Sequence, residues 1–598
     1  MHAHCYQPPR EDPWLEVVEA EPSAAPDHDW NARIDRECYS RLGGVEIRQR
    51  DPRAIARDPD ARAGLARIVN LYGWCSFDVG ATLCEWLEVE APDTLAAMIA
   101  GDAASVRRWG HGNAIAAPYH HVILPLATQR DRITEVRWGI ADFRRRFGRE
   151  PEGMWLPECA VDEDTLDVVA AAGIKFTILA PYQVRASEDH RGMPVRWRGA
   201  KGREIIILPY DGNLAGEVAF GGLLQDPLAL ARRLAPNDGA SSSARCTTLA
   251  TDGETFGHHH RNGEVTLANA LARLAQGADN PAAGLTNAAA LIAANPPRIG
   301  VELVSPSSWS CAHGVERWRS NCGCRLDGSK PPAQQWRGPL RDALTALAAR
   351  CHDIYEREAS SIFVNDPWET RDEYGEVVAR DGASLVEFVT SRLREGASDA
   401  QQHRAHELLE LERAAMRVFT SCAWFFDEVE RIETRQVLRY AARALELSGV
   451  SSRLAPDFLH WLAPARGSTP NSGSASDLFV REALPHRDPS WRAAAAAAAC
   501  ASVGLPHTRV ALYDAAVLRD SKQEECWLVT VTHRRTLQAT RLVARVRGTG
   551  PSLVVSVTDA QEEHGSAKDI PVFEFPEAIA RLLLGATALD DIALMAAP

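Results

Sequence analysis

The sequence predicts an α/β protein whose first ~300 residues form an α/β layer or a parallel β/α barrel. Short apolar runs rich in β-branched residues alternate there with helix-like segments; the runs cover residues 174–179, 204–208 and 246–250. Continuous apolar runs are typical of parallel strands that are covered on both faces. Helices are expected at residues 132–147 and 161–172. This alternation places functional side chains at the carboxyl ends of the strands.

The rest of the chain changes character twice, and 598 residues are too many for a single core. Helical patterns dominate from residue 334 to 448, and alternating strand patterns begin at residue 509. Between them lie a linker rich in Gly, Ser and Pro at 465–477 and an alanine-rich helix at 493–499. We therefore expect four parts: an α/β domain (1–305), a helical domain (306–464), the linker with its helix (465–505) and a small β-rich module (506–598).

The amino-acid composition limits the classes of partner and the cellular location that we expect. Lys and Arg total 66 and Asp and Glu total 80, so the formal charge of −14 argues against nucleic acid or an anionic membrane as a partner. No run approaches the ~18 apolar residues of a membrane span, and the polar N-terminus lacks the apolar core of a signal peptide. Thirteen scattered cysteines fit reduced thiols better than a disulfide framework. A cytoplasmic location is expected.

Two carboxylates, Glu158 and Asp252, each follow a predicted strand of the α/β domain. A parallel barrel brings both to one face, although they lie far apart in the sequence. Cleavage of a glycosidic bond needs two carboxyl groups: one attacks or stabilises the anomeric carbon, and the other protonates the leaving oxygen. An ordinary glutamate at a helix start is the alternative interpretation of Glu158.

A metal site is a competing interpretation of the same region. Asp252 and Glu254 are followed by three consecutive histidines at 258–260, and His4 or His121 is available to join them. Such ligands suit Zn²⁺ or a similar ion. Consecutive histidines on an extended segment point in alternate directions, so at most two of the three can meet one ion. Metal-dependent sugar deacetylases use ligands of this kind.

A third cluster comprises Cys311, His313, Cys322 and Cys324. Three cysteines and one histidine are a ligand set for structural zinc, but their spacing is not one of the common zinc-finger spacings. A tight loop of buried thiols is the alternative, and both interpretations stay open. Nearby Trp309 is a candidate to line the site.

Four segments resemble motifs of glycoside hydrolase family 57. Residues 155–160 (Trp-Leu-Pro-Glu-Cys-Ala) resemble its nucleophile motif, and residues 252–258 resemble its acid/base motif. Residues 119–126 are similar to its second motif. The first motif is matched by His2-Ala3-His4 followed by Gln7-Pro8, with Cys5 and Tyr6 inserted. Segments 4–14, 28–31 and 311–324 are similar to the branch of this family that carries domain of unknown function 3536.

The resemblance implies an incomplete (β/α)7 barrel followed by a helical domain that contributes to the rim of the active site. It implies retention of configuration on α-linked glucans, with Glu158 as nucleophile and Asp252 as acid/base. The expected substrate-binding residues are His4, Gln7, His121, Trp155, Glu254, His258, Trp309 and Trp424.

The leading interpretation is a retaining glycosidase or α-glucanotransferase that works through a glycosyl-enzyme intermediate. The linkage expected for its substrate is α-1,4. This interpretation needs no catalytic metal and no other cofactor; no Walker loop, dinucleotide fingerprint or Ser-His-Asp elbow is present. It predicts a separation of about 5–5.5 Å between the two carboxyls. Two alternatives stay open: a metal-dependent polysaccharide deacetylase-like hydrolase and a non-catalytic glycan-binding protein. The choice between hydrolysis and transfer depends on the shape of the acceptor site, which no motif reports.

Overall fold

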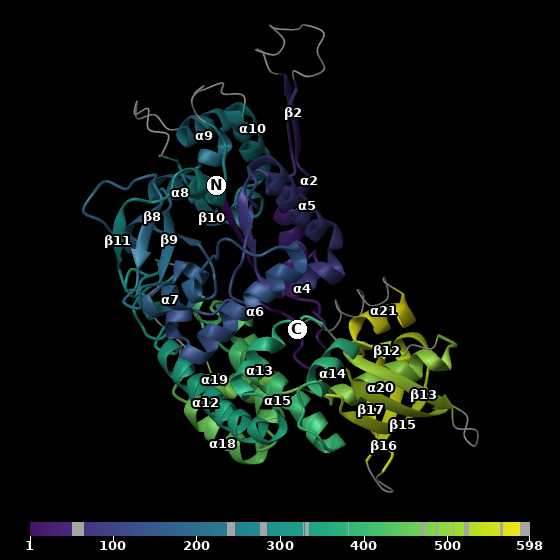
Figure 1. Ribbon diagram of the computed structural model, residues 1–598. Helices are drawn as coiled ribbons and strands as arrows, with labels where there is room; N and C mark the ends of the chain where they lie inside the picture. The colour runs from purple at the N-terminus through teal and green to yellow at the C-terminus, as the bar shows by residue number, and fades with distance from the viewer. Residues whose placement is uncertain are drawn as a thin grey trace. The chain divides into compact units, whose positions relative to one another are not determined.

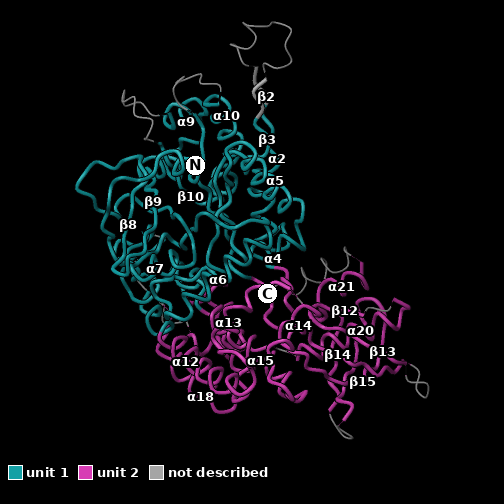
Figure 2. The backbone as a smooth tube through the Cα atoms, viewed as in Figure 1, with its two compact units in different colours: residues 1–9, 21–341, 419–428 teal, residues 10–20, 342–418, 429–598 magenta. Residues whose placement is uncertain are grey.

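The computed structural model describes residues 1–50, 65–235, 246–275, 284–326, 328, 334–380, 382–467, 473–485, 488–505, 508–519, 525–561 and 566–585. They form two compact units (Figure 2). Unit 1 comprises residues 1–9, 21–341 and 419–428, and unit 2 comprises residues 10–20, 342–418 and 429–598. The four-part division expected from the sequence stays a prediction, and residues 468–472 of its linker lie outside the described residues.

Unit 1 is built around parallel strands (Figure 1). Their order is β10 (Ala250–Asp252), β1 (His2–Cys5), β4 (Ser76–Val79), β5 (Ala114–Ile115), residues 153–154, β6 (Phe176–Leu179) and β9 (Glu204–Pro209). Isolated parallel bridges at Gly153 and Met154 join β5 to β6. Within the described residues no ladder joins β9 to β10, where the Asp211 amide donates to the Thr248 carbonyl at 2.7 Å. The predicted incomplete (β/α)7 barrel is confirmed.

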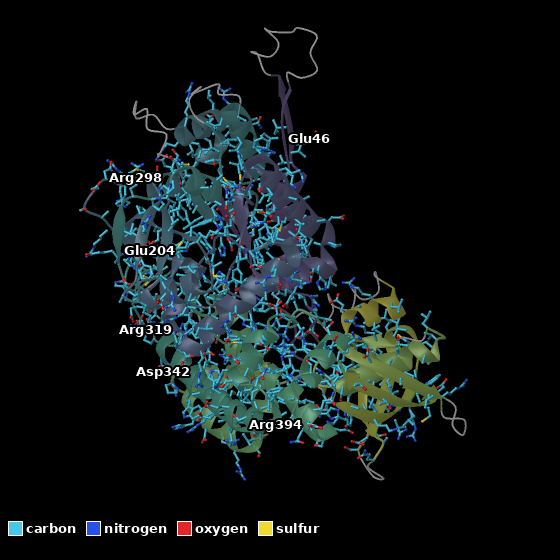
Figure 3. The ribbon with its side chains drawn as sticks, viewed as in Figure 1. Glu46, Glu204, Arg298, Arg319, Asp342 and Arg394 are labelled. Atoms are coloured by element: carbon cyan, nitrogen blue, oxygen red, sulfur yellow. The ribbon has the colours of Figure 1, made fainter. Side chains whose placement is uncertain are left out.

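The central strands are enclosed on both faces. Every residue of β1, β4 and β6 is buried, as expected for parallel strands enclosed on both faces. The sheet continues beyond β9 through β8 (Val195–Arg198), β11 (Gly300–Leu303) and β7 (Val184–Arg185). Separately, β2 (Glu46–Arg50) and β3 (Leu65–Val69) pair antiparallel. Exposed charged side chains, such as Glu204 and Arg298, lie on the outside (Figure 3).

Helices connect the strands, and the two helices that the sequence predicts begin at typical capping residues. The Thr128 hydroxyl caps α6 (Gln129–Phe147), which ends at Gly148 with φ 66°; the Asp162 carboxylate caps α7 (Glu163–Ala171). Both helices lie where the sequence predicts them. The other α-helices described in unit 1 are α1 (Trp30–Ile34), α2 (Ser40–Gly44), α4 (Ala81–Glu90), α5 (Pro92–Trp109), α8 (Gly212–Ala219), α9 (Pro227–Leu234), α10 (Gly263–Ala275), α11 (Ala288–Ala294) and α16 (Cys422–Phe425).

One strand prediction is wrong in its placement. The apolar run at 246–250 is not the strand itself, because β10 begins only at Ala250. The Cys246 amide instead donates to the Gly192 carbonyl, and the Thr248 carbonyl accepts from Asp211. These bonds tie the run to neighbouring loops, so the ladder with β1 starts later and ends at Asp252.

Unit 2 contains a set of helices and a separate antiparallel sheet. Its described helices are most of α12 (Arg337–Ile362), α13 (Pro367–Tyr374), α14 (Ala383–Thr390), α15 (Asp399–Arg417), α17 (Ile432–Leu447), α18 (Ser451–Leu462), α19 (Ala475–Leu478), α20 (Pro489–Ser502) and α21 (Glu577–Leu584). None of the described helices of the chain is long and apolar enough to cross a membrane. The predicted change to a helical pattern after residue 334 is confirmed.

The sheet of unit 2 is six-stranded, with neighbours in sequence order. Its strands are β12 (Arg509–Val510), β13 (Tyr513–Arg519), β14 (Cys526–His533), β15 (Ala539–Arg547), β16 (Val554–Asp559) and β17 (Lys568–Pro571). Helix α20 packs on this sheet with residues 493–500 fully buried. Alanine side chains are short, so the helix axis approaches the strands closely. The expected β-rich module and its alanine-rich helix are both present.

A buried ion network ties residues 10–20 to the rest of unit 2. The Glu16 carboxylate accepts hydrogen bonds from the guanidinium groups of Arg413 and Arg535, the latter at 2.9 Å. Arg413 also donates to Glu410 at 3.0 Å. Burial raises the pKa of Glu16, but the charges of Arg413 and Arg535 outweigh it and hold this pKa far below its ordinary value. If Glu16 loses its charge, the buried guanidinium groups of Arg413 and Arg535 lose one of the carboxylates that neutralise them.

We predict that Glu16→Gln lowers the free energy of unfolding of unit 2 by about 3 kcal/mol, because it removes one partner of a buried ion network. The control is Glu19→Gln, since Glu19 is half-exposed and pairs with Arg492 at 2.9 Å; its cost is below about 1 kcal/mol. Urea unfolding followed by circular dichroism measures both. Equal midpoints for the two variants would contradict the prediction.

Candidate active site

Polar side chains gather where the parallel strands of unit 1 end. In the ladders His4 is paired with Asp78 on β4 and with Asp252 on β10. His121 follows β5, and Glu158 follows the bridge residues 153–154. Because parallel strands end at the same edge, these side chains occupy one end of the barrel. Both carboxylates singled out in the sequence are among them.

A buried carboxylate, Asp78, organises the charges at this end. Its two oxygens accept from His2 Nε2 at 3.0 Å and from His4 Nδ1 at 2.9 Å. Burial raises the pKa of Asp78, but the two histidines outweigh this and keep the pKa below its usual value. Burial lowers the pKa of His4, but the charge of Asp78 and its hydrogen bond raise this pKa to about 9. His4 is therefore positively charged at neutral pH.

His121 continues this network as a neutral ring. Its Nε2 lies 3.1 Å from His4 Nε2, and its Nδ1 lies 2.7 Å from Ser421 Oγ. Burial and the charge of His4 lower the pKa of His121 far below its usual value. His4 therefore donates to His121 Nε2, and His121 Nδ1 donates to the Ser421 hydroxyl. The ring of Tyr6 stacks on His121 with centroids 3.6 Å apart, and His121 has a strained φ of 55°.

Glu158 is fixed by a loop far away in the sequence. Its Oε2 accepts from Trp309 Nε1 at 3.0 Å and from Ser310 Oγ at 2.6 Å. Its backbone carbonyl accepts from the Trp309 amide at 2.9 Å. Glu158 also has a left-handed φ of 59°, which turns its side chain away from the run of buried residues before it. The side chain is partly exposed, so it is both oriented and accessible.

Asp252 differs from Glu158 in its electrostatics. Burial raises its pKa, and the charges of Glu254 and Glu158 raise it further; His4 opposes them, and the pKa is about 7. Near neutral pH Asp252 is thus protonated in much of the protein. A carboxyl group in this state can donate a proton.

Glu254 is held beside Asp252 by two donors. Gln7 Nε2 donates to Glu254 Oε1 at 2.8 Å, and the Tyr39 hydroxyl donates to the same oxygen at 2.6 Å. The bond from Gln7 joins two of the expected substrate-binding residues, Gln7 and Glu254, in one network.

The histidines of the predicted metal site do not converge. His258 Nδ1 lies 2.6 Å from Glu37 Oε2, and His260 Nε2 lies 2.9 Å from the Ala219 carbonyl. Among the described residues, no group of clustered ligand atoms contains Asp252 together with these histidines. The geometry therefore does not favour the deacetylase interpretation.

The expected aromatic residues differ in exposure. Trp155 is fully buried and packs against His2, His4 and Trp309, with ring centroids 4.8–5.1 Å apart. Trp424 is also fully buried, and its Nε1 donates to the Arg337 carbonyl at 3.1 Å. Trp309 alone of the three is partly exposed. Sugar stacking on Trp155 and Trp424 stays a prediction, whereas Trp309 has an accessible edge in this conformation.

The structure adds residues that sequence reasoning did not select. Asp78 lies near the end of the strand β4, a position of the same kind as those of Glu158 and Asp252. Tyr39, Ser310 and Ser421 had no such signal. Ser310 lies 152 positions from Glu158, and Ser421 lies 300 positions from His121, so only the folded chain brings them together.

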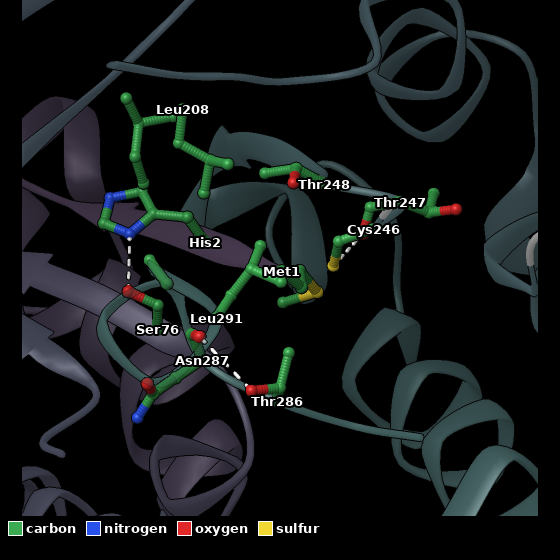
Figure 4. Close-up of a pocket in the computed structure, with 12 residues that line it drawn as sticks. Met1, His2, Ser76, Leu208, Cys246, Thr247, Thr248, Thr286, Asn287 and Leu291 are labelled. Atoms are coloured by element: carbon green, nitrogen blue, oxygen red, sulfur yellow. Dashed lines mark hydrogen bonds between the residues drawn. The ribbon is translucent and has the colours of Figure 1, made fainter. Parts of the chain in front are cut away.

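A small pocket, partly open to solvent, lies elsewhere in unit 1 (Figure 4). It is lined by His2 and Ser76, the first residues of β1 and β4, and by Thr247 and Thr248, which precede β10. In the close-up His2 bonds to Ser76. These are the amino ends of the strands, so the pocket is separate from the end that carries Glu158 and Asp252.

Comparisons with known proteins agree with this arrangement. Residues 75–279 match Glycosyl hydrolase family 57, and residues 333–553 match Domain of unknown function (DUF3536). The fold and the acidic cluster define a β/α barrel protein with its candidate site at the carboxyl ends of the strands. Residues 75–279 thus form a region of glycosyl hydrolase family 57, and residues 333–553 form a DUF3536 region, the combination that the branch of this family carrying DUF3536 has.

The matched relatives are distant. An alpha-amylase of Pyrococcus horikoshii is 24% identical over 182 residues, which are 30% of this chain and 27% of the relative. A 4-alpha-glucanotransferase of Thermococcus litoralis is 23% identical over 141 residues, 23% of this chain and 20% of the relative. The chain thus spans about a quarter of their length. The crystal structure of an exo-type maltose-forming amylase from Pyrococcus sp. ST04 shares the fold, with a TM-score of 0.57, 14% identity and coverage of 77% of this chain and 82% of that one.

We predict that Asp78→Asn lowers the pKa of His4, because it removes the buried charge that raises this pKa. Titration of selectively labelled histidines by NMR measures the change. The control is Glu152→Gln, which alters a separate pair in which Glu152 bonds to His111 at 2.9 Å. A His4 titration that is unchanged in Asp78→Asn would contradict the assignment of charge to His4.

Proposed function

We propose that this protein is a retaining glycoside hydrolase or glucanotransferase that acts on α-linked glucan, with α-1,4 linkages as the first choice. One observation carries the proposal. Asp252, a carboxyl group with a pKa of about 7, shares the barrel end with Glu158, which accepts two hydrogen bonds on one oxygen. Two carboxyl groups in different environments are what acid-assisted displacement at an anomeric carbon requires.

In the first step, Glu158 attacks the anomeric carbon while Asp252 gives its proton to the glycosidic oxygen. The bond between that carbon and the leaving oxygen breaks, and an ester between the sugar and Glu158 forms. Trp309 and Ser310 hold the carboxylate in the attacking orientation. The leaving saccharide departs with the proton from Asp252.

In the second step, Asp252 is ionised and acts as a base. It removes a proton from water or from a sugar hydroxyl, which attacks the same carbon and releases Glu158. Two inversions give overall retention. Water gives hydrolysis and a sugar hydroxyl gives transfer, so the shape of the acceptor site decides the outcome.

The remaining expected residues have proposed roles in binding. The positively charged His4 and the neutral His121 offer hydrogen bonds to sugar hydroxyls, and Gln7 and Glu254 form a rigid pair beside Asp252. The other proposed contacts are His258, Trp155, Trp309 and Trp424. The names of the matched relatives, an alpha-amylase and a 4-alpha-glucanotransferase, support α-glucan as substrate.

We further propose a cytoplasmic location and the division into domains at residues 305, 464 and 505. Free cysteines, mostly buried, support the location. The negative net charge of −14 supports a partner other than nucleic acid or an anionic membrane.

We predict that kcat/KM falls as the pH rises through about 7, because Asp252 must be protonated in the free enzyme. Glu254→Gln removes a negative charge that raises this pKa, so it moves the alkaline limb to lower pH. Initial rates on maltooligosaccharides across the pH range measure both effects. The control is the exposed Glu204→Gln. An alkaline limb that moves to higher pH, or not at all, in Glu254→Gln would argue against Asp252 as the acid.

We predict that Glu158→Ala lowers kcat by about 10⁴-fold or more, since it removes the nucleophile. Azide then fits the vacated space and restores turnover, giving a glycosyl azide of inverted configuration. The anomeric proton signals in NMR identify the product. Unchanged activity in Glu158→Ala, or a rescued product of retained configuration, would be inconsistent with the proposed role.

A further inference from the structure

The segment at 311–324 gathers three thiols and one imidazole. Cys311 Sγ lies 3.9 Å from Cys322 Sγ and 3.7 Å from Cys324 Sγ, and Cys324 Sγ lies 3.5 Å from His313 Nδ1. All four ligand atoms lie within 4.8 Å of one another. The proposed sugar chemistry uses none of these side chains.

These distances are those of ligands around a tetrahedral metal. With a Zn–S bond of about 2.3 Å and a Zn–N bond of about 2.0–2.1 Å, tetrahedral geometry places sulfurs about 3.8 Å apart and sulfur and nitrogen about 3.5 Å apart. The three observed distances differ from these values by little more than a tenth of an ångström. A disulfide needs sulfurs about 2.05 Å apart, so the cluster is not a set of disulfide partners.

The surrounding backbone orients the sulfurs. Amide groups of His313 and Arg317 donate to the Cys311 sulfur, and the Ala312 amide donates to the Cys324 sulfur. Gly323 has a φ of 85°, a conformation that favours glycine and that brings the sulfurs on either side of it to the same centre. Amide donors of this kind orient the ligand sulfurs of a metal site.

A buried cation complements the charge that such a site carries. Arg337 is fully buried, and its guanidinium donates to the Cys324 carbonyl at 2.9 Å and to the Phe426 carbonyl at 3.0 Å. Three thiolates and one Zn²⁺ leave a net charge of −1, which a neighbouring guanidinium offsets.

We propose that Cys311, His313, Cys322 and Cys324 bind one Zn²⁺ ion as a structural site. The four side chains fill a tetrahedral coordination sphere, so no position is left for substrate. Binding releases the three thiol protons to solvent and changes no oxidation state.

The site is adjacent to the loop that orients Glu158. Ser310 precedes Cys311 directly and, with Trp309, donates to the Glu158 carboxylate. The Ser308 hydroxyl bonds to the Gly314 carbonyl at 2.5 Å, which ties the start of the loop to the turn after His313. Zinc at this position would fix the path of residues 308–313. This consequence rests on the proposed function, whereas the metal site itself does not.

The first test is metal analysis of the full-length wild-type protein, purified without chelators. Inductively coupled plasma mass spectrometry is expected to find about one zinc per chain. Replacement by Co²⁺ is expected to give the absorption bands of tetrahedral thiolate coordination. Less than about 0.1 metal per chain, in protein made with ample zinc, would overturn the proposal, as would an iron–sulfur chromophore or a disulfide between these cysteines.

Variants locate the ion and separate the two claims. Cys322→Ala and Cys324→Ala are expected to lose the zinc and to melt at lower temperature, whereas Cys246→Ala, which removes a comparably half-buried thiol, keeps it. Glu158→Ala is expected to bind zinc like the wild type while losing turnover. Zinc retained in both cluster variants overturns the site. Zinc bound at full stoichiometry without any glucan activity contradicts only the proposed function. If the cluster variants do not fold, the Co²⁺ spectrum of the wild type decides.

Discussion

The burial of the Asp78 carboxylate is the constraint on which the charged end of the barrel depends. A charge at 0% exposure is stable only when it is paired, and the register of β1 and β4 supplies His2 and His4 as partners. Burial, together with the positive charge that Asp78 stabilises on His4, then keeps His121 neutral. It also opposes the carboxylates that raise the pKa of Asp252. One strand pairing therefore sets the protonation of several groups.

The sequence was sufficient for much of the fold because burial leaves a local pattern. Apolar runs marked β6 and β9, and the helices expected at 132–147 and 161–172 match α6 and α7. It placed β10 a few residues too early, because Cys246 and Thr248 bond to loops and the ladder with β1 begins only at Ala250. Local patterns carry no record of bonds between distant loops.

In the candidate site, too, sequence patterns select some residues and only the folded chain brings in the others. Glu158 and Asp252 follow strands in the sequence, so a rule about parallel sheets selects them. The donors on Glu158 come from a loop that no periodicity connects to it, and the strained φ of 59° is a property of the folded backbone. The cysteine and histidine content of residues 311–324 was visible in the sequence, but only the interatomic distances distinguish a metal-binding arrangement from a loop of buried thiols.

The central claim is that Glu158 forms a covalent bond to sugar. The direct measurement is incubation with a fluorinated α-glucosyl fluoride, which slows the second step, followed by proteolysis and mass spectrometry of the peptides. The account predicts one glucosyl ester per chain, on the peptide that contains Glu158. An ester on Asp252 or another carboxylate, or steady turnover of this reagent to a product of inverted configuration without any adduct, would contradict it.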